Sequence, residues 1–268
     1  AFITGASSGL GLELARALGR DSWKLGLFDR NVERLARVEE ELSSAGLTVL
    51  AYPGDVTDAD EFTVAVNSFA ATNDGLDVMI NNAGVAGSGT LMEVPLEDWR
   101  WIVDINFMGV VHGARAAIPH LQRNGAGLMI NVASAAAFAS APGMISYNAT
   151  KAAVLSLSET LSGELAGSGT QVSVVMPTFV PTNLIESFGG PAEARERATQ
   201  GLRDSKYAAV DAARDILLQA AAGRLYIVLP RSARLLCRLK RWAPLFFLKR
   251  VLALRERMRA GQANPPQA

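Results

Sequence analysis

Strand-like and helix-like segments alternate along most of the chain, and this alternation restricts the fold more than any other feature. Seven short runs rich in β-branched and aromatic residues predict strands: Ala1–Ile3, Lys24–Phe28, Thr48–Tyr52, Asp77–Ile80, Leu128–Val132, Gln171–Met176 and Leu225–Val228. Longer amphipathic segments between them predict crossover helices: Leu12–Leu18, Val32–Ser43, Ala59–Ala71, Leu96–Gln122, Tyr147–Leu165 and Ala208–Ala222. This order implies parallel pairing with helices on both faces. We expect an α/β, doubly wound, three-layer Rossmann-like fold.

Glycine-rich and polar clusters follow the predicted strands. Ligands of open parallel sheets bind at the carboxyl ends of the strands, near the point where the strand order reverses. The clusters stand at those ends: T-G-A-S-S-G-L-G after the first strand, D-V after the third, N-N-A-G after the fourth, A-S after the fifth and P-T-F-V-P-T after the sixth. The sequence therefore predicts one ligand site along this edge of the sheet.

The first cluster predicts a dinucleotide site. Gly5, Gly9 and Gly11 remove side chains where backbone amides approach a pyrophosphate at a helix N-terminus. Asp29 ends the second strand, 18 residues after Gly11, where a carboxylate can accept hydrogen bonds from ribose hydroxyls and repel a 2′-phosphate. This favours NAD over NADP, although the neighbouring Arg30 could turn toward a phosphate. The alternatives are a turn that only packs helix on strand and an Asp29 that caps the next helix.

Tyr147 and Lys151 are four residues apart on a predicted helix, so they share one face. A phenol with a pKa near 10 is too weak an acid for proton transfer at neutral pH, and a nearby ammonium favours its ionised form. The pair therefore suggests a general acid–base device, and a solvated surface pair is the alternative.

These motifs, in this order, resemble the short-chain dehydrogenase/reductase family over about residues 1 to 228. The resemblance includes Ser134, which precedes Tyr147 by 13 residues, and Asn106. It implies a catalytic tetrad of Asn106, Ser134, Tyr147 and Lys151, the sheet order 3-2-1-4-5-6-7 and a homodimer or homotetramer. It also implies cofactor contacts from Gly5, Ser7, Ser8, Gly9, Leu10, Gly11, Asp29, Arg30, Asp55, Val56, Asn82, Ala83, Gly84, Tyr147, Lys151, Pro177, Val180 and Thr182. Pro177-Thr178 departs from the family's usual P-G, which leaves the loop geometry open.

The leading interpretation is an oxidoreductase that transfers hydride between NAD(H) and a lipophilic secondary alcohol or ketone. In it, Tyr147 exchanges the substrate proton, Ser134 holds the substrate oxygen and Lys151 also binds the nicotinamide ribose. Asn106 holds a water that links Lys151 to solvent. Two alternatives stay open: an NADPH-dependent carbonyl or acyl-type ketone reductase, and a dinucleotide-binding interaction protein without catalysis.

Substrate choice is expected in residues 135–146 and 183–206, which follow the fifth and sixth strands. The apolar candidates for the pocket are Phe138, Met144, Phe179, Ile185 and Phe188.

Composition fits a soluble globular protein, because 49% of the residues are hydrophobic and 19% are charged. No stretch reaches the roughly 18 apolar residues of a spanning helix. A single cysteine, Cys237, forms no intramolecular disulfide, so we expect a cytoplasmic location. His112 and His120 stand without nearby carboxylates, and we predict no metal site.

The C-terminal segment differs in charge from the rest of the chain. From Arg231 to Arg259 there are ten Arg and Lys residues and only Glu256 as an acid, a charge of +9 that the remainder balances. We therefore divide the chain into residues 1–230, the dinucleotide-binding and catalytic domain, and 231–268, a basic amphipathic extension. The extension suits a helix pair broken at Pro244 that lies on a membrane surface, or a cover over the substrate cleft or a partner chain. Nucleic-acid binding lacks a recognition motif.

Overall fold

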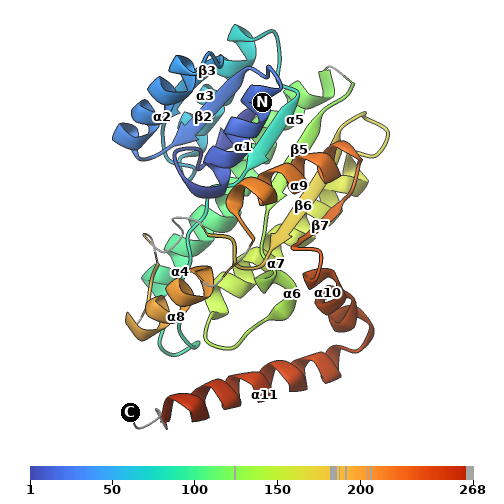
Figure 1. Cartoon of the computed structure of the whole chain (residues 1–268). Coiled ribbons are helices and arrows are strands. Elements are labelled where there is room, and N and C mark those ends of the chain that lie inside the picture. Colours follow the sequence, from blue (N-terminus) through green and yellow to red (C-terminus); the bar gives the residue numbers. More distant parts are fainter. Residues whose placement is uncertain are drawn as a thin grey trace.

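The computed structural model describes residues 1–123, 125–181, 186, 188–190, 192–203, 205 and 207–263. Seven strands form one sheet of order β3-β2-β1-β4-β5-β6-β7, and every neighbouring pair is parallel. They are β1 Phe2–Thr4, β2 Leu25–Asp29, β3 Val49–Pro53, β4 Val78–Asn81, β5 Leu128–Val132, β6 Gln171–Pro177 and β7 Tyr226–Leu229. The predicted doubly wound α/β fold and its strand order are confirmed (Figure 1).

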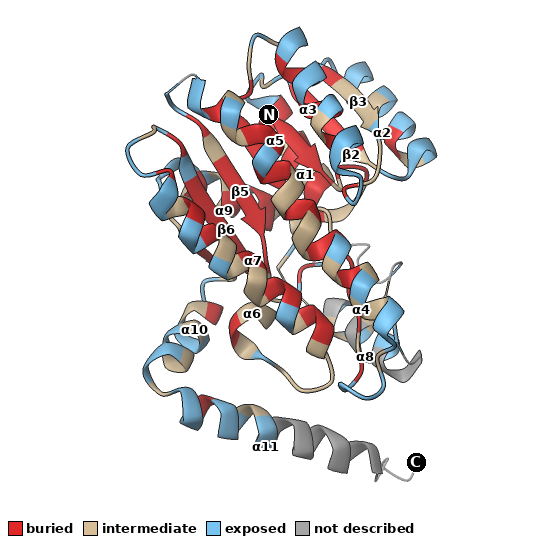
Figure 2. Ribbon diagram, turned by 180° about the vertical axis from the view of Figure 1, so that it is seen from behind, coloured by how far each residue is buried: buried red, intermediate tan, exposed pale blue. Residues whose placement is uncertain are grey.

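Helices cover both faces of this sheet, which makes the three layers. One face carries α1 Gly9–Arg20, α2 Val32–Ser44 and α9 Ala209–Ala221, and the other carries α3 Ala59–Thr72, α5 Gly109–Arg123 and α7 Ile145–Glu164. Because side chains alternate along a strand, Ile3 of β1 packs against the face that carries α1, α2 and α9. Its neighbour Phe2 packs against the face that carries α3, α5 and α7. The central strands are therefore buried on both faces (Figure 2).

The long helix predicted over Leu96–Gln122 is interrupted. It consists of α4 Leu96–Val103, a π-helical turn η1 Asp104–Met108 and α5. Asn106 lies inside the π turn and is 0% exposed. A π turn inserts an extra residue into the helix and redirects its side chains, and such turns are frequent at functional sites.

Further helices that do not cover the sheet lie after the fifth, sixth and seventh strands. They are α6 Ala136–Ala139, α8 Ala192–Arg203, and the pair α10 Ala233–Trp242 and α11 Pro244–Ala263, which meet near Pro244 as expected. Helix α10 packs against β7 and α6, and α11 packs against α10. No helix in the described part of the chain is long and apolar enough to span a membrane.

Candidate active site

A cavity of about 1120 Å³ opens at the carboxyl ends of the first six strands, β1 to β6. It lies where the strand order reverses between β1 and β4, the position where sheets of this kind bind ligands. Nearly all predicted cofactor residues line it: Gly5, Ser7, Ser8, Gly9, Leu10, Asp29, Arg30, Asp55, Val56, Asn82, Ala83, Gly84, Tyr147, Lys151, Pro177 and Val180. Gly11 and Asn106 are not part of the lining, and Thr182 lies outside the described residues.

The glycine turn joins β1 to α1 in a conformation that requires glycine. Gly5 and Gly9 have φ angles of 62° and 54°, in the left-handed region. A Cβ atom at Gly11 would lie 2.2 Å from the carbonyl oxygen of Gly5. The side-chain amide nitrogen of Asn82 donates to the backbone carbonyl oxygen of Thr4 over 2.9 Å, which links this turn to the end of β4. The first amides of α1 are thereby held at the cavity wall, where a helix N-terminus attracts an anion.

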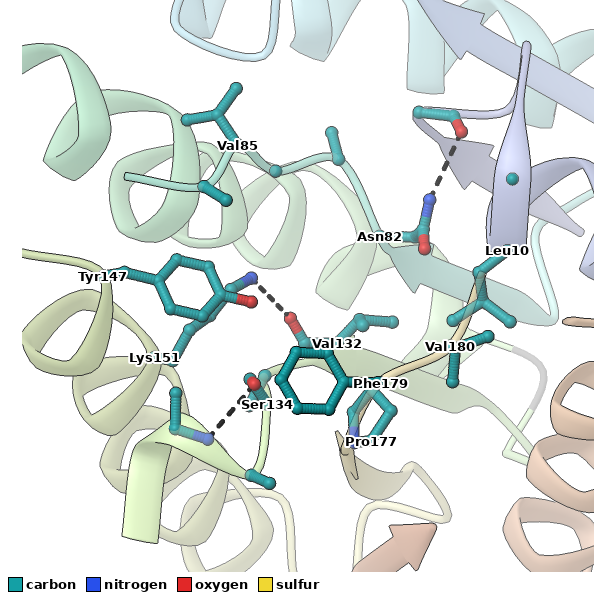
Figure 3. Close-up of a pocket in the computed structure, with 18 of the residues that line it drawn as sticks. Leu10, Asn82, Val85, Val132, Ser134, Tyr147, Lys151, Pro177, Phe179 and Val180 are labelled. Carbon is teal, nitrogen blue, oxygen red and sulfur yellow. Dashed lines mark hydrogen bonds between the residues drawn. The ribbon is translucent and has the colours of Figure 1, made fainter. Parts of the chain in front are cut away.

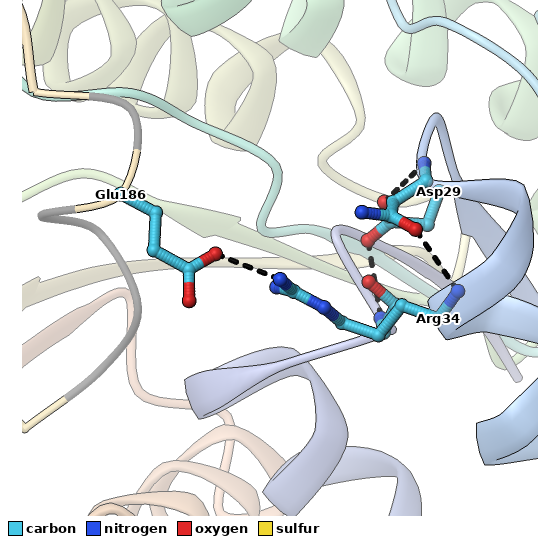
Figure 4. Close-up of polar contacts among 5 residues, drawn as sticks. Asp29, Arg34 and Glu186 are labelled. Carbon is cyan, nitrogen blue, oxygen red and sulfur yellow. Dashed lines mark hydrogen bonds and ion pairs between the residues drawn. The ribbon is translucent and has the colours of Figure 1, made fainter.

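The Asp29 carboxylate is held by the glycine turn and by the start of α2 (Figure 4). Its oxygens accept hydrogen bonds from the backbone nitrogens of Ser7, over 3.1 Å, and Asn31, over 2.9 Å. The cap of α2 is Asn31, whose side chain accepts from the Arg34 nitrogen. Asp29 is therefore at the cavity wall and is not the residue that caps this helix.

Two residues that the sequence analysis does not name individually stand at this end of the cavity. Arg34 and Glu186 line it and form an ion pair over 2.8 Å. They come from α2 and from the segment after β6, and they are 152 residues apart. A pattern within either segment gives no sign of such a pairing, since only the tertiary fold brings the two together.

Asp55 and Val56 follow β3 at the same cavity. The Asp55 carboxylate accepts from the backbone nitrogen of Thr57 over 2.9 Å, a contact typical of a local turn. The Val56 carbonyl oxygen lies 2.9 Å from Nδ1 of His112, and Nε2 of His120 lies 2.7 Å from the side-chain oxygen of Asn67. Both imidazole rings thus have a hydrogen-bond partner, and no cluster of metal-ligating side chains occurs among the described residues.

Ser134, Tyr147 and Lys151 converge on the wall opposite the glycine turn (Figure 3). Ser134 lies two residues beyond the end of β5, and its hydroxyl accepts from the Ala136 nitrogen over 3.1 Å. Tyr147 and Lys151 lie on α7, with the Lys151 ammonium 5.9 Å from the centre of the phenol ring. The ammonium donates to the Val132 carbonyl oxygen over 3.0 Å. The predicted pairing on one helix face is therefore present in the structure.

Burial changes the proton affinities of this pair. It raises the pKa of Tyr147 above its ordinary value, against the opposing effect of hydrogen bonding to the Ser134 side chain. It lowers the pKa of Lys151 to about 8. The direction for Tyr147 differs from the acidified phenol that the i, i+4 spacing suggested, because the loss of solvation in this buried position outweighs the hydrogen bond with the Ser134 side chain.

Asn106 lies behind the cavity wall and fastens the loop after β4. Its side-chain oxygen accepts from the Val85 nitrogen over 2.8 Å, and its amide donates to the Val85 oxygen over 2.9 Å. The same amide donates to the Thr150 hydroxyl over 3.3 Å, next to Lys151. A Cβ atom on Gly84 would lie 3.3 Å from the Lys151 nitrogen, so this glycine leaves room for the ammonium.

The apolar part of the cavity contains four of the five predicted substrate residues. Phe138, Met144, Phe179 and Phe188 line it, whereas Ile185 is outside the described residues. The C-terminal helices add further wall residues that no single sequence pattern assigned to the site: Leu236, Leu239, Phe247, Arg250, Val251 and Ala253. Of the sequence interpretations of this extension, the cover over the chain's own cleft agrees with this arrangement.

Comparisons with known proteins give one consistent result. Residues 1–190 match the family model described as short chain dehydrogenase. An oxidoreductase of Staphylococcus aureus (strain USA300) is 32% identical over 205 residues, which cover 76% of this chain and 87% of that protein. A 3-oxoacyl acyl-carrier-protein reductase of Staphylococcus aureus (strain Mu50) is 31% identical over 189 residues, covering 70% and 77%. The crystal structure of a short chain dehydrogenase/reductase from Burkholderia phymatum in complex with NAD superposes with a TM-score of 0.85 at 32% identity, over 90% of this chain and 92% of that chain.

Proposed function

The chain belongs to the short-chain dehydrogenase family, and from this membership we propose that it transfers hydride between NAD(H) and a lipophilic secondary alcohol or ketone. Membership makes it an NAD(P)-dependent dehydrogenase or reductase. The observation that carries the finer proposal is the convergence of Ser134, Tyr147 and Lys151 on one wall of a cavity whose other wall is the glycine turn. The 1–230 segment holds all of these groups, and we propose it as the catalytic domain, acting in a homo-oligomer.

The residues at the cavity fit a dinucleotide. The glycine turn leaves no room for a side chain at Gly5 or at Gly11 and directs the start of α1 at the cavity, as a pyrophosphate requires. The Asp29 carboxylate already holds two backbone amides, and its remaining lone pairs are available to ribose hydroxyls. When bound, the nicotinamide accepts hydride from an alcohol or gives it to a ketone.

The protein's own groups handle the proton and the substrate oxygen. We propose that the Ser134 hydroxyl donates to the substrate oxygen and that Tyr147 gives or takes the proton on that oxygen. The raised pKa of Tyr147 keeps the phenol protonated, which suits its role as the acid in ketone reduction. In alcohol oxidation the phenol must first lose its proton, and the charge of Lys151 at 5.9 Å favours that step. Asn106 is a positioning residue, since it acts through the Val85 loop and Thr150.

A chain-length series tests the proposed substrate class. With NAD and straight-chain 2-alkanols of increasing length, we expect kcat/KM to rise roughly fourfold per methylene until the apolar part of the cavity is filled, since a buried methylene contributes about 0.8 kcal/mol. The measurement is the absorbance of the reduced nicotinamide. Alcohols of equal length with a terminal second hydroxyl serve as controls and should lose this gain. A flat series, or one in which the diols react faster, would show that the substrate is polar.

The cofactor preference depends on Asp29. We expect Asp29→Ala to lower the ratio of kcat/KM for NAD to that for NADP by about tenfold or more, because it removes a negative charge that repels a 2′-phosphate. Steady-state kinetics with both cofactors measure this ratio. Asp60→Ala, on the exposed first turn of α3, is the matched control and should leave the ratio unchanged. An unaltered ratio in Asp29→Ala would show that another residue selects the cofactor.

One observation favours a second candidate, an NADPH-dependent reductase of carbonyl groups on acyl-type substrates. Arg30 and Arg34 both line the cavity beside Asp29, and guanidinium groups bind phosphate well. The ion pair between Arg34 and Glu186 speaks against it, because that guanidinium already has an anionic partner. The third candidate, an interaction protein without catalysis, would bind NAD and turn over no alcohol or ketone in the series above.

A further inference from the structure

The C-terminal helices expose an unusual share of large apolar side chains. Of the 16 exposed large hydrophobic residues in the described part of the chain, seven lie within residues 231–253: Leu235, Leu236, Trp242, Leu245, Phe246, Leu248 and Leu252. Trp242 is 85% exposed and Leu245 is 75% exposed. We call residues 231–253 the basic arm. A surface cluster of this kind marks an interaction site, since single exposed apolar residues are usually scattered.

Cations surround these apolar side chains. The basic arm contains seven Arg and Lys residues and no Asp or Glu. Five of the seven are exposed, namely Arg231, Arg238, Arg241, Lys249 and Arg250, and no salt bridge found in the described part of the chain includes any cation of the arm. The Arg250 guanidinium lies 5.7 Å from the ring centre of Phe246, so cationic and aromatic groups share this surface. The surface therefore fits an anionic partner with an apolar layer beneath its charges.

Helix α11 has two apolar faces with different surroundings. Phe247 and Val251, one helical turn apart, line the catalytic cavity, and Phe247 is buried. Leu245, Leu248 and Leu252 follow an i, i+3, i+7 spacing on another face and are exposed. In both views of the molecule α11 stands away from the sheet (Figures 1 and 2). In the described part of the chain, α10 is the one element that packs extensively against α11.

We propose that the basic arm is a docking surface for an anionic lipid bilayer. A bilayer surface offers both features that the arm matches, because its headgroups attract Arg and Lys and its acyl region takes up Trp and Leu side chains. Long basic side chains can reach the headgroups while their stems lie along apolar surface. Since the inner face of α11 lines the cavity, docking by the outer face brings the cavity wall next to the lipid. Binding of the basic arm to a bilayer does not depend on the reaction proposed above.

Vesicle flotation of the full chain tests this proposal without any measurement of turnover. We expect the protein to float with vesicles that contain about a third phosphatidylglycerol and to stay in the lower fraction with pure phosphatidylcholine, because each cation near an anionic surface strengthens binding severalfold. Trp242→Ser combined with Leu245→Ser should reduce the bound fraction at least tenfold, and so should Arg238→Glu combined with Lys249→Glu. None of these four residues lines the cavity, so NAD binding should not change.

The matched control is Val64→Ser combined with Leu218→Ser, which removes two side chains of similar exposure, 67% and 64%, from α3 and α9. This control should float like the unaltered protein, and thermal melting should show that every variant is folded. Equal flotation of all variants, or no flotation with anionic vesicles, would overturn the proposal. A second result would also overturn it. If no vesicle binding were seen, and light scattering showed a dimer of the unaltered chain but a monomer of the variant altered at Trp242 and Leu245, the outer face would bind a second copy of the chain.

Discussion

Replacing Tyr147 with phenylalanine is expected to lower kcat by about 10²- to 10⁴-fold, the usual contribution of a positioned acid or base, while the Kd for NAD stays nearly unchanged. The substitution removes one hydroxyl from a residue that is 7% exposed and leaves its ring in place. The phenylalanine should therefore pack as the tyrosine does, next to the Lys151 ammonium. Steady-state kinetics in both reaction directions and calorimetric titration with NAD measure the two quantities.

The control for this variant is Tyr52→Phe, which makes the same chemical change on β3. Tyr52 packs against the Phe2 ring at 5.5 Å between ring centres and does not line the cavity. We expect it to retain full turnover. If Tyr147→Phe kept its activity as well, the proton would have to pass through another group, and Tyr147 would lose its proposed role.

The same residue gives the reaction a direction-dependent response to pH. Alcohol oxidation needs the phenolate form of Tyr147. Because burial holds the pKa of Tyr147 above its ordinary value, the phenolate is a minor form at neutral pH and its fraction grows as the pH rises. Lys151 keeps its proton below its pKa of about 8. The rate of alcohol oxidation should therefore increase as the pH rises toward 8. Ketone reduction uses the protonated phenol, so its rate should not increase over the same range.

The fold and most of the cavity could be predicted because both depend on local patterns. Strand-like runs bounded by glycine and polar clusters gave seven strands in the observed sheet, and the clusters lie at one edge because parallel strands end together. The π turn around Asn106 could not be predicted from periodicity. In this turn Asn106 forms hydrogen bonds with Val85 and Thr150. Both residues are far from Asn106 in the sequence, so a local pattern does not reveal these contacts.

Two other differences have the same origin in tertiary packing. The spacing of Tyr147 and Lys151 indicated a favourable charge, but the pKa of the phenol depends on burial, which the spacing does not contain. The sequence predicts an amphipathic extension over residues 231–268. Which of its apolar side chains line the cavity and which face outward depends on how α10 packs against β7 and α6.

Gly11→Ala is expected to weaken NAD binding at least tenfold and to lower the free energy of unfolding by about 1–3 kcal/mol, the usual cost of overpacking. The new Cβ atom would lie 2.2 Å from the Gly5 oxygen and 2.6 Å from the Asn82 amide nitrogen. The same side-chain amide of Asn82 donates to the backbone carbonyl oxygen of Thr4 over 2.9 Å. Because the new Cβ atom displaces this amide, the substitution should separate the glycine turn from the end of β4. Since the turn directs the start of α1 at the cavity, its displacement should misplace the amides that face the pyrophosphate. Calorimetric titration with NAD and denaturant unfolding measure the two effects.

Two glycines separate these effects. A Cβ atom on Gly163 of α7 would meet no atom of the described residues within 4 Å beyond its own helical turn, so Gly163→Ala should leave both quantities unchanged or stabilise the helix by roughly 0.5–1 kcal/mol. Gly19 lies on α1 like Gly11, but its Cβ would meet only leucine side chains, with Leu47 at 2.6 Å. Because these leucine side chains are remote from the glycine turn, Gly19→Ala should leave the Kd for NAD unchanged, whatever its effect on the free energy of unfolding. If Gly11→Ala lost stability but bound NAD as tightly as Gly19→Ala, the glycine turn would be a packing device and the pyrophosphate would bind elsewhere in the cavity.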